Sequence, residues 1–404
     1  MQTQGTLAVL PNLRASVRDD GRLILTEKFL SGMESYLDFW DGPVVVFIEP
    51  NSQPSDNLDN VAVERRGLPF GIDITPFDAP DMHTKLAACA VAQGGISYRQ
   101  NHLAGLCSTI DVPFVYGTEY TLKTRLQIIG AEEGNPLVRA KRTVWEWNQE
   151  RHNRNAIRQA AGIQCNGVPT FDAYSDLNKN SLLFFDTRVT EKLLIDADRL
   201  ETRLARLRKG EQLRLAFSGR LNSMKGADHL IALAQILKAR SVAFEFVICG
   251  GGPLEEDLRR AITHDGLRDL VDFRGVLRFE EELLPLIKKD VDLFVCCHRQ
   301  GDPSCTYLET FACGVPIIGY DNEAFTGLLG HVDAGKAVAM DDLVALADLV
   351  QELATSREQI EQWSLAALHF AEQNTFESAF SARIEQLRVL AQHGADSRFG
   401  KSAV

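Results

Sequence analysis

A repeating order of segments in the second half of the chain limits the folds that it can adopt. Residues 291–320, VDLFVCCHRQGDPSCTYLETFACGVPIIGY, show this order most clearly: apolar run, turn-forming residues, amphipathic segment, apolar run. Leu293–Cys297 predicts a strand, and Thr306–Cys313 predicts a helix that Ser304 caps. Gly314 ends that helix, and a second apolar strand follows it. Strand–turn–helix–strand units of this kind build parallel sheets that are covered by helices.

The same order recurs along the chain and predicts an α/β protein of two successive doubly wound units. The predicted strands are Leu23–Leu25, Val44–Ile48, Val61–Val63, Gly95–Tyr98, Val112–Tyr116, Ile163–Asn166, Leu182–Phe185, Leu213–Ser218, Phe244–Ile248 and Val271–Phe273. The predicted helices are His83–Ala92, Leu103–Thr109, Arg139–Arg158, Ala227–Ala239, Leu254–Ile262, Phe279–Ile287, Leu343–Thr355, Ile360–Ala371 and Phe376–Gln392. We expect domains at 1–190 and 191–372, then a C-terminal helix that packs back toward the first domain and a polar tail at 373–404.

Charge and hydropathy exclude some classes of function. The net charge is −12, which argues against nucleic acid as a partner. No apolar run reaches the roughly 18 residues of a membrane span, and the first residues hold too short an apolar run for a signal peptide. The eight cysteines include no CxxC pair, and the spacing of Cys296, Cys297 and Cys305 fits no standard metal-ligand set. We therefore expect a cytoplasmic protein with packing cysteines and no metal.

Two polar clusters follow predicted strands in the first half. Arg99–His102 follows one strand and Gly117–Tyr120 follows the next. Because ligands bind at the carboxyl ends of the strands in an open parallel sheet, His102 and Glu119 are site candidates. The alternative is that His102 caps a helix and that Glu119 pairs with Lys123 or Arg125. Earlier in the first half, Gly32 predicts a turn between a strand and a helix.

The predicted helix Arg139–Arg158 carries six basic residues and only two glutamates, with Trp145 and Trp147 in its middle. A basic helix that bears tryptophans in an acidic protein predicts contact with anionic lipid headgroups, and thus a peripheral position at the inner membrane face. The alternative is a solvated helix face with both tryptophans in the core. The sequence leaves both readings open.

The turns of the second half combine features that suit a phosphate group. Arg220 and Lys225 flank a glycine-containing turn between a strand and a helix, where two cations can hold a diphosphate. The helix that begins near Ser304–Thr306 offers free N–H groups to an anion, and Glu309 lies one turn inside it, within reach of sugar hydroxyls. Gly250–Pro253 lacks the GxGxxG spacing of a dinucleotide site, which disfavours an NAD-dependent oxidoreductase.

The segments GRLNSMKG, FVICGGGP, VDFRG and DLFVCCHRQGDPSCTYLETFACGVPIIG, in this order between Leu215 and Tyr320, resemble the nucleotide-sugar half of retaining glycosyltransferases of group 1, or family 4. The resemblance covers about 110 residues, and the first half is similar in architecture only. It implies the GT-B fold, in which two Rossmann-like domains face a central cleft. It also implies a nucleoside diphosphate sugar as donor, a saccharide or lipid-linked acceptor, and no further cofactor.

The resemblance also implies roles for residues. Arg220 and Lys225 would bind the donor diphosphate, Glu309 the ribose, and Arg274–Val276 would border the base. The backbone around Ser304–Thr306 would support the β-phosphate. The complete set comprises Arg220, Lys225, His102 and Glu119 as catalytic candidates, with Glu309, Gly219, Gly251, Arg274, Asp302, Pro303, Ser304, Cys305 and Thr306 as donor-binding candidates.

Two positions depart from the family pattern. The family usually has a glutamate eight positions before the ribose-binding glutamate, where this chain has Gly301. Gln300 or Asp302 would then contact the donor sugar, or sugar recognition differs. The family often has a histidine where Glu119 falls, which leaves the acid/base group open. We expect transfer of a sugar to an acceptor hydroxyl with retention, in polysaccharide or glycolipid biosynthesis. The alternatives are a nucleotide-sugar epimerase on the same fold and a non-catalytic nucleotide-sugar-binding subunit.

Overall fold

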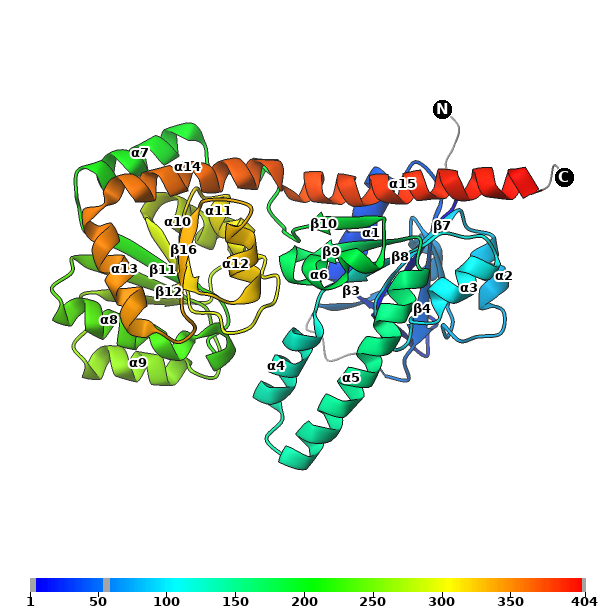
Figure 1. Cartoon of the computed structure of the whole chain (residues 1–404), viewed down its shortest axis with the longest axis horizontal. Coiled ribbons are helices and arrows are strands. Elements are labelled where there is room, and N and C mark those ends of the chain that lie inside the picture. The colour runs from blue at the N-terminus through cyan, green and yellow to red at the C-terminus, as the bar shows by residue number, and fades with distance from the viewer. Residues whose placement is uncertain (1–4, 54–58, 402–404) are drawn as a thin grey trace.

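The computed structural model describes residues 5–53 and 59–401, and it contains two α/β domains side by side (Figure 1). The first domain has a ten-stranded sheet in the order β10-β9-β8-β7-β1-β4-β2-β3-β5, with β6 paired to β4. Its pairings are parallel except those of β3 with β2 and β5. The strands are β1 Leu7–Leu10, β2 Arg14–Val17, β3 Leu23–Thr26, β4 Val44–Pro50, β5 Asn60–Val63, β6 Gly71–Ile74, β7 Val91–Gly95, β8 Phe114–Thr118, β9 Gly162–Asn166 and β10 Ser181–Phe184.

The helices of the first domain lie between these strands in the sequence and form the crossover connections that a parallel sheet needs. They are α1 Glu27–Phe39, α2 Met82–Ala87, α3 Leu103–Thr109, α4 Leu122–Glu132, α5 Pro136–Gln159 and α6 Gly167–Tyr174. Helices α4 and α5 form a hairpin that projects away from the sheet (Figure 1). Within the hairpin, Arg125 of α4 donates to Glu146 and Glu150 of α5 at 2.8 and 2.7 Å, which joins the two helices.

The second domain has a six-stranded, wholly parallel sheet in the order β13-β12-β11-β14-β15-β16. Its strands are β11 Leu213–Ser218, β12 Phe244–Cys249, β13 Val271–Gly275, β14 Leu293–Cys296, β15 Ile317–Tyr320 and β16 Gly335–Val338. Its helices are α7 Ala197–Arg208, α8 Leu230–Ala239, α9 Glu255–His264, α10 Leu284–Asp290, α11 Thr306–Phe311, α12 Glu323–Leu329, α13 Leu343–Thr355 and α14 Arg357–Gln373. Strand order reverses between β11 and β14, and ligands bind at such a switch point in open α/β sheets.

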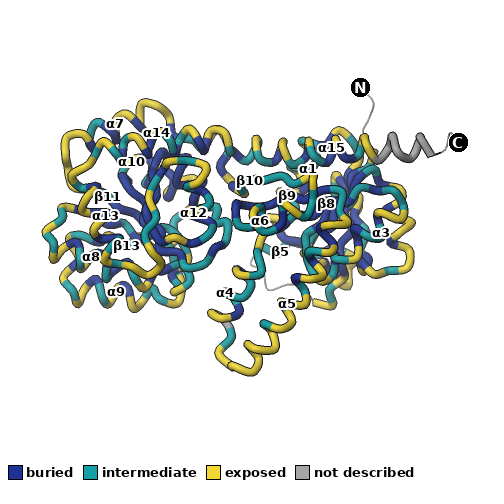
Figure 2. The backbone as a smooth tube through the Cα atoms, in the orientation of Figure 1, coloured by how far each residue is buried: buried dark blue, intermediate teal, exposed yellow. Residues whose placement is uncertain are grey.

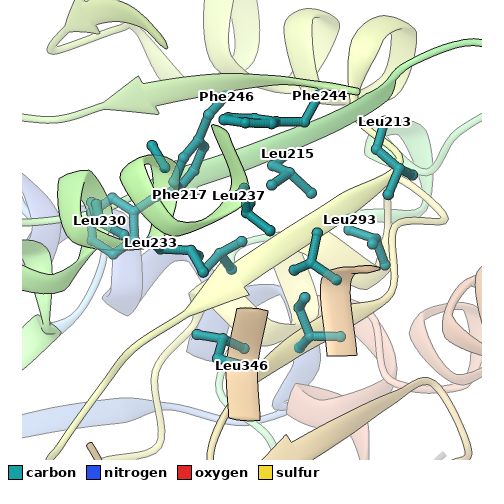
Figure 3. Packing of buried hydrophobic residues seen from close by; sticks show 14 of the residues in the cluster. Leu213, Leu215, Phe217, Leu230, Leu233, Leu237, Phe244, Phe246, Leu293 and Leu346 are labelled. Atoms are coloured by element: carbon teal, nitrogen blue, oxygen red, sulfur yellow. The ribbon is translucent and has the colours of Figure 1, made fainter. Parts of the chain in front are cut away.

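The core of the second domain explains why its strands were predictable from apolar runs. Phe217, Phe244 and Phe246 from β11 and β12 are fully buried (Figure 3). They pack against Leu230 and Leu233 of α8, on one face of the sheet. A strand covered on both faces is apolar along most of its length, and Leu293–Cys296 of β14 is so throughout.

Helix α15, Phe376–Lys401, leaves the second domain and runs along the first (Figure 1). Arg383 donates from Nε to the side-chain oxygen of Gln164 on β9, at 2.8 Å. Its guanidinium also lies 4.5 Å from the ring centre of Phe184 on β10. The chain therefore crosses between the domains twice, after β10 and after α14. The polar tail expected after Gln392 is helical as far as Lys401, and the last three residues lie outside the described ranges.

Several predicted elements are wrong in detail. The predicted helix His83–Ala92 is a shorter helix, α2, followed by a central strand, β7, because the apolar run Ala87–Ala92 suits either structure. Gly32 lies inside α1 rather than in a turn. Helix α7 of the second domain, which buries Leu200, Leu204 and Leu207, was not among the predicted helices. No helix within the described ranges combines the length and apolar character that crossing a bilayer requires.

Candidate functional site

The turns after β11 and β14 bring a cation and a carboxylate together at the carboxyl ends of neighbouring strands. Lys225 lies in the turn after β11, and its Nζ is 3.0 and 3.2 Å from the two carboxylate oxygens of Asp302. Both side chains are mostly buried. Arg220, in the same turn as Lys225, is exposed and forms no ion pair within the described chain. An anion that enters here would meet Arg220 and compete with Asp302 for Lys225.

The backbone of these turns is fixed by close packing that only glycine permits. Gly226 has φ +67°, and a Cβ on it would lie 2.7 Å from the carbonyl carbon of Cys297 and nearer still to its oxygen. Gly250 has φ +132°, and its Cβ would lie 3.0 Å from the carbonyl carbon of Gly219. The glycine-rich turn after β12 thus allows a neighbouring backbone segment, the turn after β11, to pack against it. Gly251 lies in this same turn.

Glu309 is buried and holds an ion pair that the sequence did not suggest. It lies in α11, and its Oε1 accepts from Arg188 Nε at 2.7 Å. Arg188 belongs to the segment that joins the domains, and its guanidinium lies 3.5 Å from the ring centre of Phe279. The carboxylate therefore points toward the segment between the domains, where it can accept hydrogen bonds from other donors if Arg188 moves.

The helix α11 begins differently from the prediction. Its first residue is Thr306 and its N-cap is Cys305, with no side-chain cap bond, so the predicted Ser304 cap is wrong. Burial raises the pKa of the Cys305 thiol to about 12, with Asp186 as the next cause, so this thiol stays protonated at neutral pH. Ser304 and Pro303 line a narrow contact with the first domain, beside Asp186 and Gly167.

A cavity of about 510 Å³ lies in the first domain, at the carboxyl ends of its central strands. The ends of β7 and β8 supply backbone from Gly94, Gly95 and Gly117. The cavity is also lined by Gly32 of α1 and by Arg383 of α15. Its walls mix glycine backbone with polar side chains, which suits a polyhydroxylated molecule.

Glu119 and Asp186 are the carboxylates of this cavity. Burial raises the pKa of Glu119, and the charge of Asp186 raises it further. Glu119 pairs with neither Lys123 nor Arg125: Lys123 pairs with Glu323, and Arg125 pairs with glutamates of α5. The expected ion pair of Glu119 is therefore wrong, and its carboxylate is open to a ligand.

The cavity and the α11 turn meet across the space between the domains. The Sγ of Cys305 lies 3.9 Å from Oδ2 of Asp186. Tyr120, at the rim of the cavity, has its pKa raised by burial and then by the charges of Glu119 and Asp302. One continuous polar region thus runs from Lys225 and Asp302 to Glu119.

Gly301 is held by the first domain. Its N–H donates to the side-chain oxygen of Gln127 at 3.3 Å, and its carbonyl accepts from Thr124 Oγ1 at 3.4 Å. A Cβ on Gly301 would lie 3.3 Å from Cβ of Glu323 and nearer to its carboxylate. The carboxylate of Glu323 thus fills the space that a side chain at position 301 would take.

Two predicted residues lie away from this region. His102 is seven residues beyond the end of β7, and its Nε2 lies 3.0 Å from the carbonyl oxygen of Phe77. Arg274 pairs with Asp272 and lines a separate surface hollow with Arg268. The structure therefore does not bring His102 or Arg274 to the shared region. In contrast, Arg188, Asp186 and Glu323 belong to it and were missed as site residues, although the strand end Asp186–Arg188 was a visible polar cluster.

Comparison with known proteins identifies the second domain. Residues 198–369 match the model of the family described as glycosyl transferases group 1. The second domain is therefore similar to this family, over less than half of the chain. The matched segment holds Arg220, Lys225, Asp302 and Glu309, the residues of the α11 region and the β11 turn.

Relatives and solved structures extend the comparison. The GDP-mannose-dependent α-(1-6)-phosphatidylinositol monomannoside mannosyltransferase of Mycobacterium tuberculosis is 32% identical over 162 residues, 38% of this chain and 41% of that protein. The α-D-kanosaminyltransferase of Streptomyces kanamyceticus is 29% identical over 209 residues, 50% of this chain and 53% of that protein. The chain thus spans about half or less of the relatives that it matches.

The overall architecture matches that of a solved two-domain structure. HepE from Anabaena, crystallised in complex with UDP, superposes with a TM-score of 0.64 at 13% identity, over 94% of this chain and 98% of that chain. The similarity includes both domains and confirms the predicted GT-B fold, with two Rossmann-like domains facing each other.

Proposed function

We propose that the protein is a retaining glycosyltransferase that moves a sugar from a nucleoside diphosphate sugar to an acceptor hydroxyl. One observation carries the proposal: the turn that holds Lys225 and the helix α11 that holds Glu309 lie across the domain boundary from a polar cavity that Glu119 lines. A donor site and an acceptor site that open onto each other are what group transfer between two bound molecules needs.

The positive charge at the β11 turn suits a diphosphate as the leaving group. As the bond between the sugar and the diphosphate breaks, negative charge grows on the diphosphate. Arg220 and Lys225 lie in the turn that would face it, and fixed cations in a partly buried site stabilise such charge by several kcal/mol, typically about 3 for one lost donor. Asp302, which neutralises Lys225 in the unliganded structure, would yield this cation to the diphosphate.

The nucleotide and the donor sugar have separate candidate contacts. Glu309 would accept hydrogen bonds from the ribose after exchanging its bond to Arg188, whose side chain is largely exposed and can move. The carboxylate of Glu323 stands beside Gly301, so it is a third candidate, with Gln300 and Asp302, for contact to the donor sugar. UDP in HepE and GDP-mannose in the mycobacterial relative's name support a nucleoside diphosphate sugar as the donor class.

The cavity in the first domain would hold the acceptor. Glu119 has a raised pKa and an open carboxylate, so it can accept a hydrogen bond from the acceptor hydroxyl that attacks the sugar. We propose a saccharide or a lipid-linked saccharide as the acceptor, in polysaccharide or glycolipid biosynthesis, with the protein in the cytoplasm and in peripheral contact with the membrane. The phosphatidylinositol-derived acceptor named for the mycobacterial relative supports an acceptor of this class.

A donor screen that follows nucleotide release, with and without an acceptor panel, tests the function. We expect Lys225→Ala and Glu309→Gln each to lower turnover at least about tenfold, because each removes a charge-assisted contact to the donor. Lys289→Ala and Glu280→Ala, which change exposed residues of the same domain, are the matched controls. Wild-type turnover in both site variants would contradict the assignment, and donor breakdown that no acceptor stimulates would favour an epimerase instead.

A further inference from the structure

We propose that the α4–α5 hairpin is a docking surface for membranes that contain anionic lipid. The hairpin projects from the first domain, and most residues in the outer half of α5 are exposed (Figure 2). Leu137 is 80% exposed, Val144 70% and Trp147 57%. The expectation that the tryptophans of α5 lie in the core is therefore wrong. Large apolar side chains gathered on one projecting element mark an interaction surface rather than scattered surface residues.

These side chains share one side of α5. At about 3.6 residues per turn, Leu137, Lys141 and Val144 form a stripe. Trp145 and Trp147 flank the stripe, one on each side. The opposite side of the helix packs on α4, where Glu146 and Glu150 pair with Arg125. The fold thus holds Leu137 and Val144 outward, while the flanking ring of Trp145 packs edge-on against Tyr98, with the ring centres 5.6 Å apart.

The charge of the hairpin indicates which kind of partner it binds. Arg139 and Lys141 form no ion pair within the described ranges, so their charges are available to a partner. Most of the other basic residues of the helix, such as Arg151 and Arg158, are also exposed. In a protein whose net charge is −12, this local excess of cations would draw the hairpin, and not the rest of the surface, to an anionic sheet.

The side-chain types favour lipid over another protein or nucleic acid. Tryptophan prefers the boundary between headgroups and acyl chains, and the stems of lysine and arginine let their charges remain among the headgroups. An amphipathic helix with tryptophan and leucine on one face and cations around it lies in that boundary. The negative net charge of the protein would repel nucleic acid, and nucleic acid has no apolar interior in which Leu137 and Val144 could be buried.

The position of the hairpin relates this surface to the cavity. Helix α4 begins at Leu122, two residues after Tyr120 at the cavity rim. Docking through the hairpin would thus hold the cavity near lipid headgroups, as a lipid-linked acceptor requires. The docking surface rests on exposure and charge alone, so it stands even if the proposed transfer reaction fails.

Vesicle binding tests the surface directly. The full chain is mixed with vesicles of phosphatidylcholine, either alone or with about one-third phosphatidylglycerol, and the bound fraction is measured by sedimentation. Tryptophan fluorescence reports on the hairpin, because Trp40 and Trp363 are buried while Trp145 and Trp147 are exposed. We expect binding to the anionic vesicles only, a blue shift of the emission, and quenching by brominated acyl chains. We also expect the binding to weaken as salt concentration rises.

Variants locate the contact. Leu137→Ser combined with Trp147→Ser, and separately Lys141→Glu, should each weaken partitioning to anionic vesicles at least about tenfold. The controls are Val344→Ser and Lys209→Glu, which change exposed residues of the second domain and should leave binding unchanged. The proposal would be overturned if the variants bound as well as the wild type or if the wild type did not bind anionic vesicles. It would also be overturned if gel filtration at increasing protein concentration showed that the hairpin mediates self-association.

Discussion

Gly226 provides a quantitative test of how the β11 turn is built. A Gly226→Ala change puts a side chain on a residue with φ +67°, which costs about 1–2 kcal/mol for the left-handed conformation alone. Its Cβ would also lie 2.7 Å from the carbonyl carbon of Cys297, where rigid backbone must shift. Overpacking of this kind costs about 1–3 kcal/mol more. We therefore expect a loss of about 2–5 kcal/mol in the free energy of unfolding.

Gly210 supplies the matched control. It has φ +74° and lies in the same domain, but a Cβ on it would meet no atom within 4 Å. Gly210→Ala should thus cost only the conformational term, and the entropy that both changes remove from the unfolded chain cancels in the comparison. Urea unfolding followed by circular dichroism gives both values. If Gly226→Ala destabilises the protein no more than Gly210→Ala, the close approach of the two turns does not hold.

Two further results should follow from titratable groups whose pKa is shifted. Burial and the charge of Lys225 lower the pKa of His298 in the folded protein. In the unfolded chain His298 titrates at its ordinary pKa of about 6.5, so below that pH the unfolded state takes up a proton that the folded state does not. Unfolding free energy should fall by about 2 kcal/mol between pH 6.5 and 5.0, and His298→Phe should remove most of that dependence in urea titrations at both pH values. Since burial raises the pKa of Glu119, activity that needs its carboxylate should decline on acidification at a pH above the ordinary glutamate range, and Glu119→Gln should abolish this acidic limb of the kcat/KM profile.

The fold of the second domain could be predicted because its sheet is buried on both faces. Strands such as Leu293–Cys296 are continuous apolar runs, and glycines follow β11 and β12 directly, at Gly219 and Gly250, where turns begin. In the first domain, the central strand β1 has only four residues, and nothing in so short a run distinguishes it from other apolar segments. Strand β7 was displaced in the prediction because an uninterrupted apolar run does not separate the end of a helix from the start of a strand.

The candidate site was predictable where its residues lie in one turn, as Arg220 and Lys225 do. It was not predictable where partners come from distant segments: Arg188 and Glu309 are 121 positions apart. Neither the hydrophobic pattern of the sequence nor its turn-forming residues indicate that two residues so far apart form an ion pair. His102 was misjudged as a strand-end residue because β7 ends at Gly95 and not at Tyr98. His102 is the N-cap residue of α3, as the alternative expected, although its side chain makes no cap bond.

The central claim is that the turn after β11 binds the diphosphate of a nucleotide at the cleft between the domains. Calorimetric titration of the wild type and of Lys225→Ala with UDP and with GDP tests it most directly, with Lys289→Ala as the control. We expect one of the two nucleotides to bind the wild type and the control equally, and to bind Lys225→Ala at least about tenfold more weakly. Equal affinity of Lys225→Ala and the wild type, or no binding of either nucleotide to the wild type, would contradict the claim.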